Sequence, residues 1–360
     1  MKNFFCLVLL AAVSLPLLAR DSRIALDPKA LVRSRFHTFE SGGVSIGPGF
    51  SVAITSRGWV EKISDQGKVE WRVKSSCPPG TGPAFDSEKL FYACADGTLV
   101  ALDLANGKLF WKLTFKDTVA SMPAIVDKLV ILQTGIGKVF AVDKDTGVPQ
   151  WIAKSPGQRN LSMRDAGQPL VAGKTVYLGM SEGVVVALEL EDGELLWKRK
   201  IFERPITSDI DFQLLYDKKY GVFAASREGI ASLSENGGKV YWNVDEQIAC
   251  SPAQNDDSIF AINTAKELLV IDKLLGTVDK RIEIKKPFMA KWEFERPLGV
   301  FVDNQKIYAL FSDELWQMDP QKATATKIKS FSNMVQKGAI SQGRLLAISS
   351  QGYLDIIPIK

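Results

Sequence analysis

The sequence contains very little histidine and cysteine. His37 is the single histidine among 360 residues, and the cysteines are Cys6, Cys77, Cys94 and Cys250. One histidine excludes a histidine-rich zinc site, and a Ser-His-Asp or Cys-His catalytic site would have to use His37. No two cysteines form a CxxC pair, which argues against a redox or zinc motif. These absences disfavour a hydrolase or a metalloenzyme.

The chain also lacks a strong charge of either sign and long internal apolar runs. Lys and Arg number 45 and Asp and Glu 41, a net charge of +4. This excess is too small to indicate nucleic-acid binding, which requires clustered Lys and Arg. After the first twenty residues no apolar run approaches the roughly 18 residues of a membrane span. We therefore expect the mature chain not to cross a membrane.

The N-terminus has the pattern of a secretory signal peptide. Lys2 supplies a positive start, and the apolar run from Phe4 to Ala19 is interrupted by Pro16. We predict a signal peptide over residues 1–19, followed by a linker over 20–32. No cysteine follows the cleavage region, so the usual bacterial lipid-attachment site is not expected.

Export places the three remaining cysteines in an oxidising compartment, where they can pair. Cys77 and Cys94 flank a Pro/Gly-rich turn, CPPGTGPAF. A local disulfide and buried free thiols both remain open from the sequence. The odd count leaves one cysteine unpaired.

A repeat extends over most of the chain. Its pattern is two apolar residues, an acidic residue, three residues, Gly, three residues and Trp. The repeat residues are Asp103, Gly107 and Trp111; Asp143, Gly147 and Trp151; Glu189, Gly193 and Trp197; and the more divergent Trp71 and Trp242. Degenerate copies have Asp272 and Gly276 with Lys280 in the Trp place, and Asp319 with Lys327. From Trp71 to Lys327 the steps are 40, 40, 46, 45, 38 and 47 residues.

A second signature precedes each motif and completes a four-stranded unit. Pro83, Pro123, Pro169, Pro252 and Pro297 each open a short segment that is followed by an apolar β-run. Four-stranded units of about 40–45 residues are typical of a β-propeller. We predict an all-β, eight-bladed propeller of antiparallel blades over residues 33–360, its last blade closed by an N-terminal strand from 33–39. Seven blades with an unpaired C-terminal tail are the alternative.

The motif residues have a structural interpretation. The Asp can accept hydrogen bonds from the amides of its hairpin turn, and the Gly supplies a left-handed conformation. The Trp is a large apolar plate that suits the gap between neighbouring blades.

This repeat resembles the pyrroloquinoline-quinone-type propeller repeat over nearly all of the mature chain. Two groups have it: quinoprotein dehydrogenases, and the propeller lipoprotein subunit of the bacterial outer-membrane β-barrel assembly machinery. The dehydrogenases usually have an adjacent cysteine pair and are much longer than this chain. The resemblance to the second group is closer and implies a non-enzymatic scaffold without a cofactor or a metal.

Two connectors carry the closer resemblance. The stretch NLSMRDAGQP (160–169) resembles that group's Leu-Ser-Leu-Arg-Gly, and SDID (208–211) resembles its Ser-Asp-Val-Asp. In that group these connectors hold the periplasmic domains of the barrel-forming subunit. The resemblance implies partner contacts at Leu161, Met163, Arg164, Asp209 and Asp211. Met163 replaces a leucine of the motif, and Asp165 replaces its glycine.

Spacing supports these connectors independently. From Trp to the next Pro there are 12 residues at 71→83 and 111→123, but 18 at 151→169. Longer loops on a rigid ring commonly carry binding function, although neutral drift of loop length is the alternative. A third long connector (280→297) contains Phe288, Met289, Trp292 and Phe294 beside Lys285, Lys286 and Arg296. It is interpreted either as a second partner patch or as a loop folded onto the ring.

The signal-peptide pattern together with this resemblance implies a periplasmic protein, peripheral to the outer membrane, that acts in the assembly and insertion of β-barrel proteins. Its partner would be the barrel-forming subunit, and unfolded outer-membrane proteins are further candidates. The alternatives are a periplasmic quinoprotein-type oxidoreductase and a propeller that binds another ligand.

Overall fold

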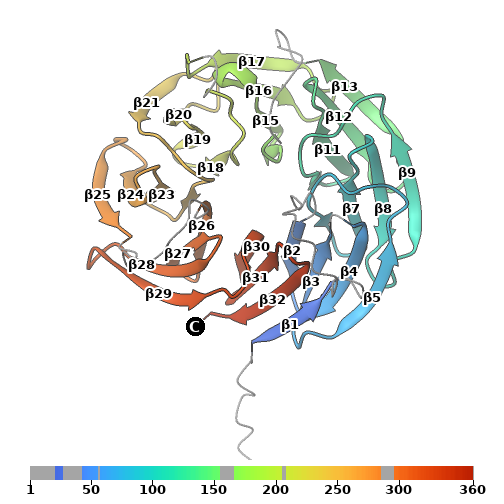
Figure 1. Cartoon of the computed structure of the whole chain (residues 1–360). Coiled ribbons are helices and arrows are strands. Elements are labelled where there is room, and N and C mark those ends of the chain that lie inside the picture. Colours follow the sequence, from blue (N-terminus) through green and yellow to red (C-terminus); the bar gives the residue numbers. More distant parts are fainter. Residues whose placement is uncertain are drawn as a thin grey trace, which may run out of the picture.

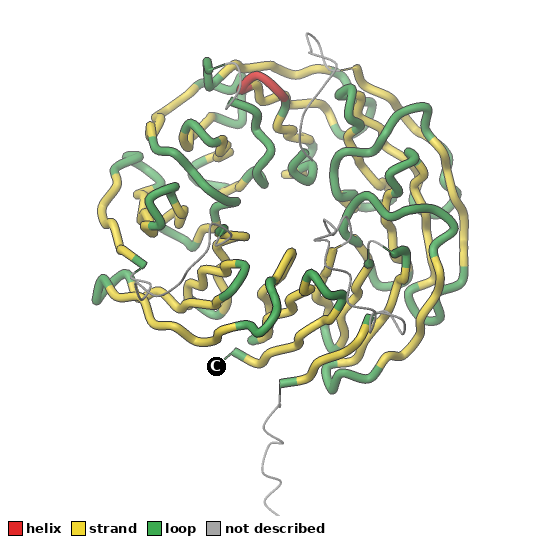
Figure 2. The backbone as a smooth tube through the Cα atoms, in the orientation of Figure 1, coloured by secondary structure: helices red, strands yellow, loops and turns green. Residues whose placement is uncertain are grey.

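The protein is a ring of eight four-stranded antiparallel sheets (Figure 1). The computed structural model describes residues 21–26, 43–55, 57–154, 166–204, 208–284 and 296–359. Within these ranges the sole helix is a three-residue 3-10 turn, η1 (Ser181–Gly183), so the backbone consists of strands and loops (Figure 2). None of the helices described is long and apolar enough to cross a membrane. The prediction of an eight-bladed all-β propeller is confirmed.

We number the blades 1 to 8 in chain order from β2, each with its innermost strand first. The strands of blades 1 and 2 are β2 (Gly43–Gly47), β3 (Phe50–Ile54), β4 (Trp59–Ser64), β5 (Val69–Lys74), β6 (Ala84–Phe85), β7 (Lys89–Ala93), β8 (Thr98–Asp103) and β9 (Leu109–Thr114). The strands of blades 3 and 4 are β10 (Ala124–Val126), β11 (Leu129–Gln133), β12 (Lys138–Asp143), β13 (Pro149–Lys154), β14 (Leu170–Ala172), β15 (Thr175–Gly179), β16 (Val184–Glu189) and β17 (Leu195–Lys200).

Blades 5 to 8 repeat this order. The strands of blades 5 and 6 are β18 (Leu215–Asp217), β19 (Gly221–Ser226), β20 (Gly229–Leu233), β21 (Val240–Asp245), β22 (Ala253–Gln254), β23 (Ser258–Ile262), β24 (Glu267–Asp272) and β25 (Val278–Glu283). The strands of blades 7 and 8 are β26 (Pro297–Asp303), β27 (Lys306–Phe311), β28 (Glu314–Asp319), β29 (Thr324–Ser330), β30 (Val335–Ser341), β31 (Arg344–Ser349), β32 (Tyr353–Pro358) and β1 (Ser22–Ala25).

The sequence of each strand matches its radial position. The two middle strands are almost continuously apolar, as in the β16 sequence VVVALE, and are buried nearly throughout. Outer strands alternate, as in the β9 sequence LFWKLT, because one side faces solvent. A blade therefore has two apolar faces and needs a neighbour on each side.

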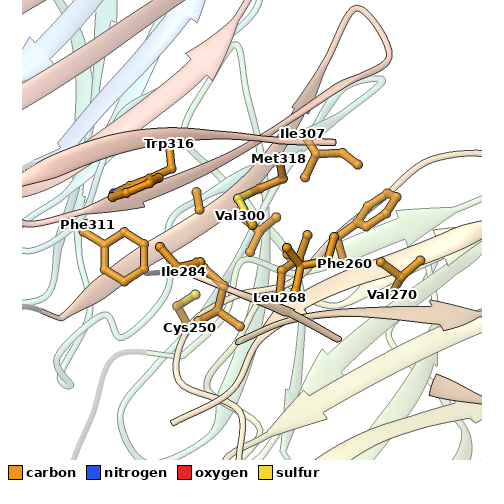
Figure 3. Packing of buried hydrophobic residues seen from close by; sticks show 13 residues of the cluster. Cys250, Phe260, Leu268, Val270, Ile284, Val300, Ile307, Phe311, Trp316 and Met318 are labelled. Atoms are coloured by element: carbon orange, nitrogen blue, oxygen red, sulfur yellow. The ribbon is translucent and has the colours of Figure 1, made fainter. Parts of the chain in front are cut away.

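The hydrophobic core lies between blades rather than at the centre of the ring. Eight clusters of buried side chains each join two neighbouring blades, including the pair formed by blades 8 and 1. Figure 3 shows the cluster between blades 6 and 7, where Phe260 and Leu268 meet Val300 and Met318. Every blade consequently depends on both neighbours for its burial.

The repeated tryptophans occupy these junctions, as predicted. Each indole N–H donates to the carbonyl of the residue that follows the acidic position of the next blade. The bonds are Trp71 to Leu104 (3.0 Å), Trp111 to Lys144 (3.1 Å), Trp151 to Leu190 (2.9 Å), Trp197 to Glu235 (2.7 Å) and Trp242 to Lys273 (3.0 Å). The motif glycine of the next blade lies against the same ring, so that a Cβ built on Gly147 would be 2.8 Å from the Trp111 indole.

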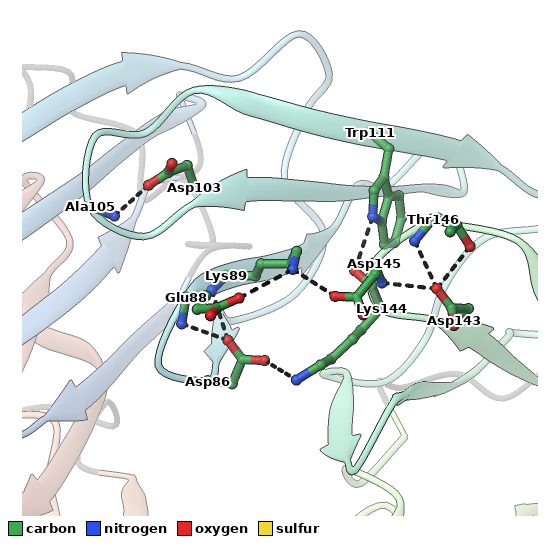
Figure 4. A network of polar contacts seen from close by, with 10 residues as sticks. All are labelled: Asp86, Glu88, Lys89, Asp103, Ala105, Trp111, Asp143, Lys144, Asp145 and Thr146. Atoms are coloured by element: carbon green, nitrogen blue, oxygen red, sulfur yellow. Dashed lines mark hydrogen bonds and ion pairs between the residues drawn. The ribbon is translucent and has the colours of Figure 1, made fainter.

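The motif aspartates hold their hairpin turns, again as predicted. The Oδ1 of Asp143 accepts hydrogen bonds from the amides of Asp145 and Thr146, at 3.0 and 2.8 Å (Figure 4). The Thr146 hydroxyl and amide lower the pKa of the Asp143 carboxyl below its ordinary value. Asp103 accepts from the Ala105 amide at 2.7 Å in the same manner.

Two ion pairs add to the junction between blades 2 and 3. Lys144 pairs with Asp86 at 2.6 Å, and Lys89 pairs with Asp145 at 2.7 Å (Figure 4). Burial opposes ionisation of Asp86, but Lys144 and two backbone amides hold the pKa of this carboxyl below its ordinary value. Because Lys144 also supplies the carbonyl for Trp111, one turn binds the neighbouring blade at two points.

The degenerate repeat keeps the junction with different residues. Lys280 stands in the Trp place, and its Nζ donates to the Pro320 carbonyl at 2.7 Å, the same acceptor position that the indoles use. Ala323 stands in the Gly place of that next blade and keeps a positive φ of 52°. Without an indole beneath it, the position no longer requires a residue that lacks a Cβ.

Both ends of the chain build blade 8. β1 pairs antiparallel with β32, with Arg23 opposite Asp355 and Ile24 opposite Leu354. The Arg23 guanidinium binds the Asp355 carboxylate at 2.6 and 2.9 Å. An N-terminal strand therefore closes the ring, but the prediction that 33–39 supplies it is wrong. The short alternating stretch Ser22–Ala25 closes it instead, because it places Arg23 on Asp355 and Ile24 in the apolar cluster between blades 8 and 1.

The closing strand lies inside the segment 20–32 that we expected to be a linker. The predicted signal peptide (1–19), the remainder of that segment from residue 27 and the 33–39 stretch lie outside the described residues.

Cys77 and Cys94 form a disulfide, with 5.9 Å between their Cα atoms. It joins the connector after β5 to the end of β7, which decides between the two alternatives left open by the sequence. Cys250 is the free cysteine in the described part of the chain and is buried. Burial raises the pKa of its thiol to about 12, so that it stays protonated and unreactive.

Exchanging glycine and alanine at equivalent positions tests the junction. Gly147→Ala should lower the free energy of unfolding by ~1–3 kcal/mol, because the new methyl group meets the Trp111 ring at a positive φ. Ala323→Gly should leave stability unchanged or raise it by up to ~1 kcal/mol, because it removes left-handed strain without opening a packed contact. Urea unfolding monitored by circular dichroism measures both. Equal effects of the two changes would contradict the proposed contact.

Removing the disulfide should destabilise the ring. Cys77→Ser with Cys94→Ser should lower the free energy of unfolding by ~2–4 kcal/mol, since the bond closes a loop of 17 residues. Wild type in reductant should show the same loss. Cys250→Ala provides the control, because it retains the disulfide and should still lose stability on reduction. A reductant-insensitive melting temperature would contradict the prediction.

Candidate partner-docking site

The two faces of the ring carry different kinds of loops. Since strands alternate in direction, turns between the first and second and between the third and fourth strands of a blade lie on one face, the turn face. Turns between the second and third strands lie on the opposite face together with the connectors between blades. We call this opposite face the connector face. Between blades 1 and 7 its longest connectors are 155–169 and 201–214, which contain every predicted partner contact.

Asp209 fastens the second of these connectors to blade 4. Its Oδ1 accepts a hydrogen bond from the Glu182 amide at 2.9 Å. Glu182 lies in η1, the turn between β15 and β16, and has a positive φ of 59°. The Ile210 amide donates to the Met180 carbonyl at 3.1 Å, and the Ile210 side chain is only 2% exposed. The connector is therefore built into the ring at this point.

Asp209 and Asp211 lie at one small cavity of about 20 Å³ on the connector face. Both carboxylates are half-buried. Ala166, the first described residue after the stretch 155–165, lines the same cavity. The structure therefore brings the end of one predicted connector beside both predicted carboxylates of the other.

Further contacts join the two connectors. A Cβ on Gly167 would be 2.6 Å from the Phe212 carbonyl oxygen, so that glycine permits this close approach. The Gln213 side-chain amide donates to the Gln168 carbonyl at 3.5 Å. The Ala166 amide donates to the Ala120 carbonyl at 2.8 Å, which ties the same stretch to the preceding connector.

The remaining predicted contacts, Leu161, Met163 and Arg164, lie outside the described residues, as does the 285–295 part of the third long connector. Their roles therefore stay predictions. The sequence gives no sign that Asp209 holds a turn. That role depends on the backbone amide of Glu182, which is 27 residues away, and no local motif indicates such a contact.

A second group of residues, not predicted from the sequence, lies on the same face. Arg227, Lys266, Arg296 and Lys337 line a cavity of about 620 Å³. Only Arg296 was noted from sequence, and no shared repeat position links the four residues. Among the described residues the one cluster with metal-ligand spacing is Cys77, Cys94 and Asp96. Its two sulfur atoms are joined in the disulfide, so this cluster offers no thiolate ligand.

Comparison with protein families identifies the family of the chain. Residues 56–282 match the family model described as outer membrane protein assembly factor BamB. Among curated proteins, the BamB of Burkholderia pseudomallei is 30% identical over 167 residues, which is 46% of this chain and 43% of that protein. The BamB of Shewanella oneidensis is 25% identical over 162 residues, 43% of this chain and 40% of that protein. The matches thus span about two fifths of these relatives.

Solved structures extend the likeness in fold. The crystal structure of BamB from Moraxella catarrhalis has a TM-score of 0.74 and 18% identity, covering 94% of this chain and 97% of that one. Quinohemoprotein alcohol dehydrogenase from Comamonas testosteroni has a TM-score of 0.66 and 15% identity, covering 86% of this chain and 70% of that one. Such identities show the propeller fold alone.

Two substitutions of Asp209 separate its hydrogen bond from its charge. Asp209→Ala should lower the free energy of unfolding by ~1–2 kcal/mol, because the half-buried Glu182 amide loses its acceptor. Asp209→Asn keeps an oxygen acceptor and should stay within ~0.5 kcal/mol of wild type. Chemical denaturation measures both, and hydrogen exchange at Glu182 reports the bond directly. An unprotected Glu182 amide in wild type would show that the bond is not formed.

Proposed function

Because the chain belongs to the family described as outer membrane protein assembly factor BamB, we propose that it is a non-enzymatic scaffold subunit in the assembly and insertion of β-barrel proteins into the outer membrane. The observation that carries the proposal is the meeting of the two long connectors at Asp209 and Asp211. These are the connectors whose sequences resemble the docking segments of the family. A rigid ring that holds two joined loops suits docking of a partner.

The partner is the barrel-forming subunit of the assembly machinery, held through its periplasmic domains. Leu161 and Met163 supply apolar contacts, Arg164 supplies guanidinium donors, and Asp209 and Asp211 supply carboxylate acceptors. The Glu182 bond supports this assignment, because it orders the connector before any partner arrives. Unfolded outer-membrane proteins are a second class of ligand.

The protein acts in the periplasm, peripheral to the outer membrane. The signal-peptide pattern supports export. The Cys77–Cys94 disulfide supports it independently, because such bonds persist in oxidising compartments and are rare in the cytosol. Retention at the membrane then comes from the partner.

A periplasmic quinoprotein-type oxidoreductase is the second candidate, favoured by the fold shared with the Comamonas dehydrogenase. Against it, the repeat carboxylates Asp103 and Asp143 already accept hydrogen bonds from the amides of their own hairpin turns, in two different blades. Adding pyrroloquinoline quinone and Ca²⁺ and recording the visible spectrum and dye-linked alcohol oxidation distinguishes the two. Stoichiometric chromophore with turnover would favour the enzyme.

The docking assignment is tested by matched charge changes on opposite faces. Asp209→Asn combined with Asp211→Asn should weaken binding to the periplasmic domains of the barrel-forming subunit by ~1–4 kcal/mol, as for hot-spot contacts. Arg164→Ala should act similarly. Asp256→Asn combined with Asp257→Asn, at exposed positions on the turn face, is the control and should bind as wild type does.

Isothermal titration calorimetry supplies the affinities, and thermal melting verifies that each variant is folded. Wild-type affinity for both the aspartate and the Arg164 variants would reject the assigned contacts. Absence of any binding by wild type would reject the scaffold function itself.

A further inference from the structure

The turn face has a cavity of its own where blades 5 and 6 meet. Its volume is about 640 Å³, which is within the roughly 300–1,000 Å³ of small-molecule sites. The β18–β19 and β20–β21 turns of blade 5 and the β24–β25 turn of blade 6 contribute to its lining, and every lining residue lies within the described range 208–284. We call it the turn-face cavity.

The absence of an ion pair leaves this space open. At the equivalent position between blades 2 and 3, Lys89 pairs with Asp145 at 2.7 Å. Between blades 5 and 6 the place of Lys89 is taken by Gly221 and that of Asp145 by Leu274, as the strand pairing and the indole acceptors show. Glycine has no side chain to fill the gap, and Leu274 is 65% exposed. Both residues line the cavity.

The walls of the cavity are fixed by bonds within the ring. Lys273, whose side chain is buried, pairs with Asp217 at 2.6 Å and so joins the two blades beneath the opening. In the β20–β21 turn the Ser234 hydroxyl donates to the Asn236 carbonyl at 2.7 Å and accepts from the Lys239 amide at 2.9 Å. A site with ordered walls loses little conformational entropy when a ligand binds.

Two tyrosines and a leucine supply apolar surface to the cavity. Tyr241 of β21 is 58% exposed, and Leu274 lies in the facing turn of blade 6. The Lys219 ammonium lies over the Tyr220 ring, 4.6 Å from its centroid, and donates to the Tyr220 hydroxyl at 2.7 Å. Because Lys219 occupies one face of Tyr220, Tyr241 is the more available ring for a ligand.

The polar side chains of the lining include donors and an acceptor. Lys218, Asn236 and Lys239 line the cavity, and their side chains have no hydrogen-bond or ion-pair partner among the described residues. The Glu235 carboxylate also belongs to the lining, and its Oε1 accepts from the Tyr216 hydroxyl at 2.9 Å. Ammonium, amide and carboxylate groups therefore surround one opening, and its charge is mixed.

We propose that the turn-face cavity binds a short neutral oligosaccharide. One face of a pyranose ring carries apolar C–H groups, which pack on a flat ring such as that of Tyr241. The hydroxyls at its edge both donate and accept, which matches the Asn236 amide, the lysine donors and the Glu235 acceptor. A small anion would meet the Glu235 carboxylate, and a wholly apolar ligand would displace water from these polar groups without replacing its bonds.

The experiment is a saturation-transfer difference NMR titration with two neutral sugars, cellotetraose and tetra-N-acetylchitotetraose. Wild type should bind at least one of them with a dissociation constant of about 1 mM or lower. Tyr241→Ala should weaken that binding about tenfold, because it removes the exposed ring. Asn236→Ala should weaken it about threefold or more, because it removes a hydrogen-bonding group.

The matched control is Phe110→Ala. Phe110 is 50% exposed and directly precedes Trp111, as Tyr241 precedes Trp242, but it lies at the junction that keeps both ion pairs. This variant should bind within about twofold of wild type, since no equivalent opening lies beside it. Melting temperatures verify that each variant is folded, and Tyr241→Phe should retain most of the affinity because it keeps the ring.

Three results would overturn the inference. The first is that neither tetrasaccharide binds wild type at about 10 mM, well above the affinity expected of a specific site. The second is equal weakening by Tyr241→Ala and Phe110→Ala, which would mean unspecific adhesion to exposed rings. The third is displacement of the sugar by a lower concentration of a ten-glutamate peptide, which would indicate a site for acidic peptides.

This inference is independent of the proposed scaffold function. The turn-face cavity and the proposed docking site lie on opposite faces of the ring, so the affinity for the barrel-forming subunit should be the same with and without saturating sugar. Failure of sugar binding would leave the scaffold function standing, and failure of partner binding would leave the sugar site standing.

Discussion

The contact on which this ring depends is a flat indole held between two blades. Blades diverge with distance from the axis, so the outer parts of each junction need a wide side chain. At five junctions a Trp fills the gap, bonds to the next blade's turn carbonyl and packs on that blade's glycine. Both contacts require the same turn conformation, which is why Asp, Gly and Trp recur together. The sequence repeat thus reflects one type of interface between neighbouring blades, which recurs around the ring.

This dependence explains which parts of the fold could be predicted from sequence. Blade number and strand order follow from the motif spacing, because each motif carries its own local turn chemistry. The position of the closing strand does not follow from the motif spacing. Ser22–Ala25 is four residues long, and its register is fixed by a side chain 332 residues away in sequence. The hydrogen bond from Lys280 could not be predicted either. A lysine side chain gives no indication that it reaches the turn carbonyl that an indole N–H binds in other blades.

The candidate site, like the fold, could be predicted only in part from the sequence. Long spacing and a local resemblance were enough to find the two connectors, and the structure places the end of one beside the carboxylates of the other. Four cationic residues from neighbouring blades line the second cavity of the connector face: Arg227, Lys266, Arg296 and Lys337. They share neither a motif nor a repeat position, so the sequence does not group them. Neighbouring blades therefore line one cavity with residues from unrelated positions, while the repeated residues hold the blades together.

Closure of the ring by both chain ends has a consequence for how the protein folds. The pairing of Arg23 with Asp355 in blade 8 joins residues that are 332 positions apart in sequence. Such pairing is entropically slow to find, and it must wait until the last strands of the chain are available. Until then blades 1 to 7 form an open arc with an apolar surface at each end. Because exposed apolar surface makes a folding intermediate prone to aggregation, the lifetime of that arc sets how long the chain is at risk before the ring closes.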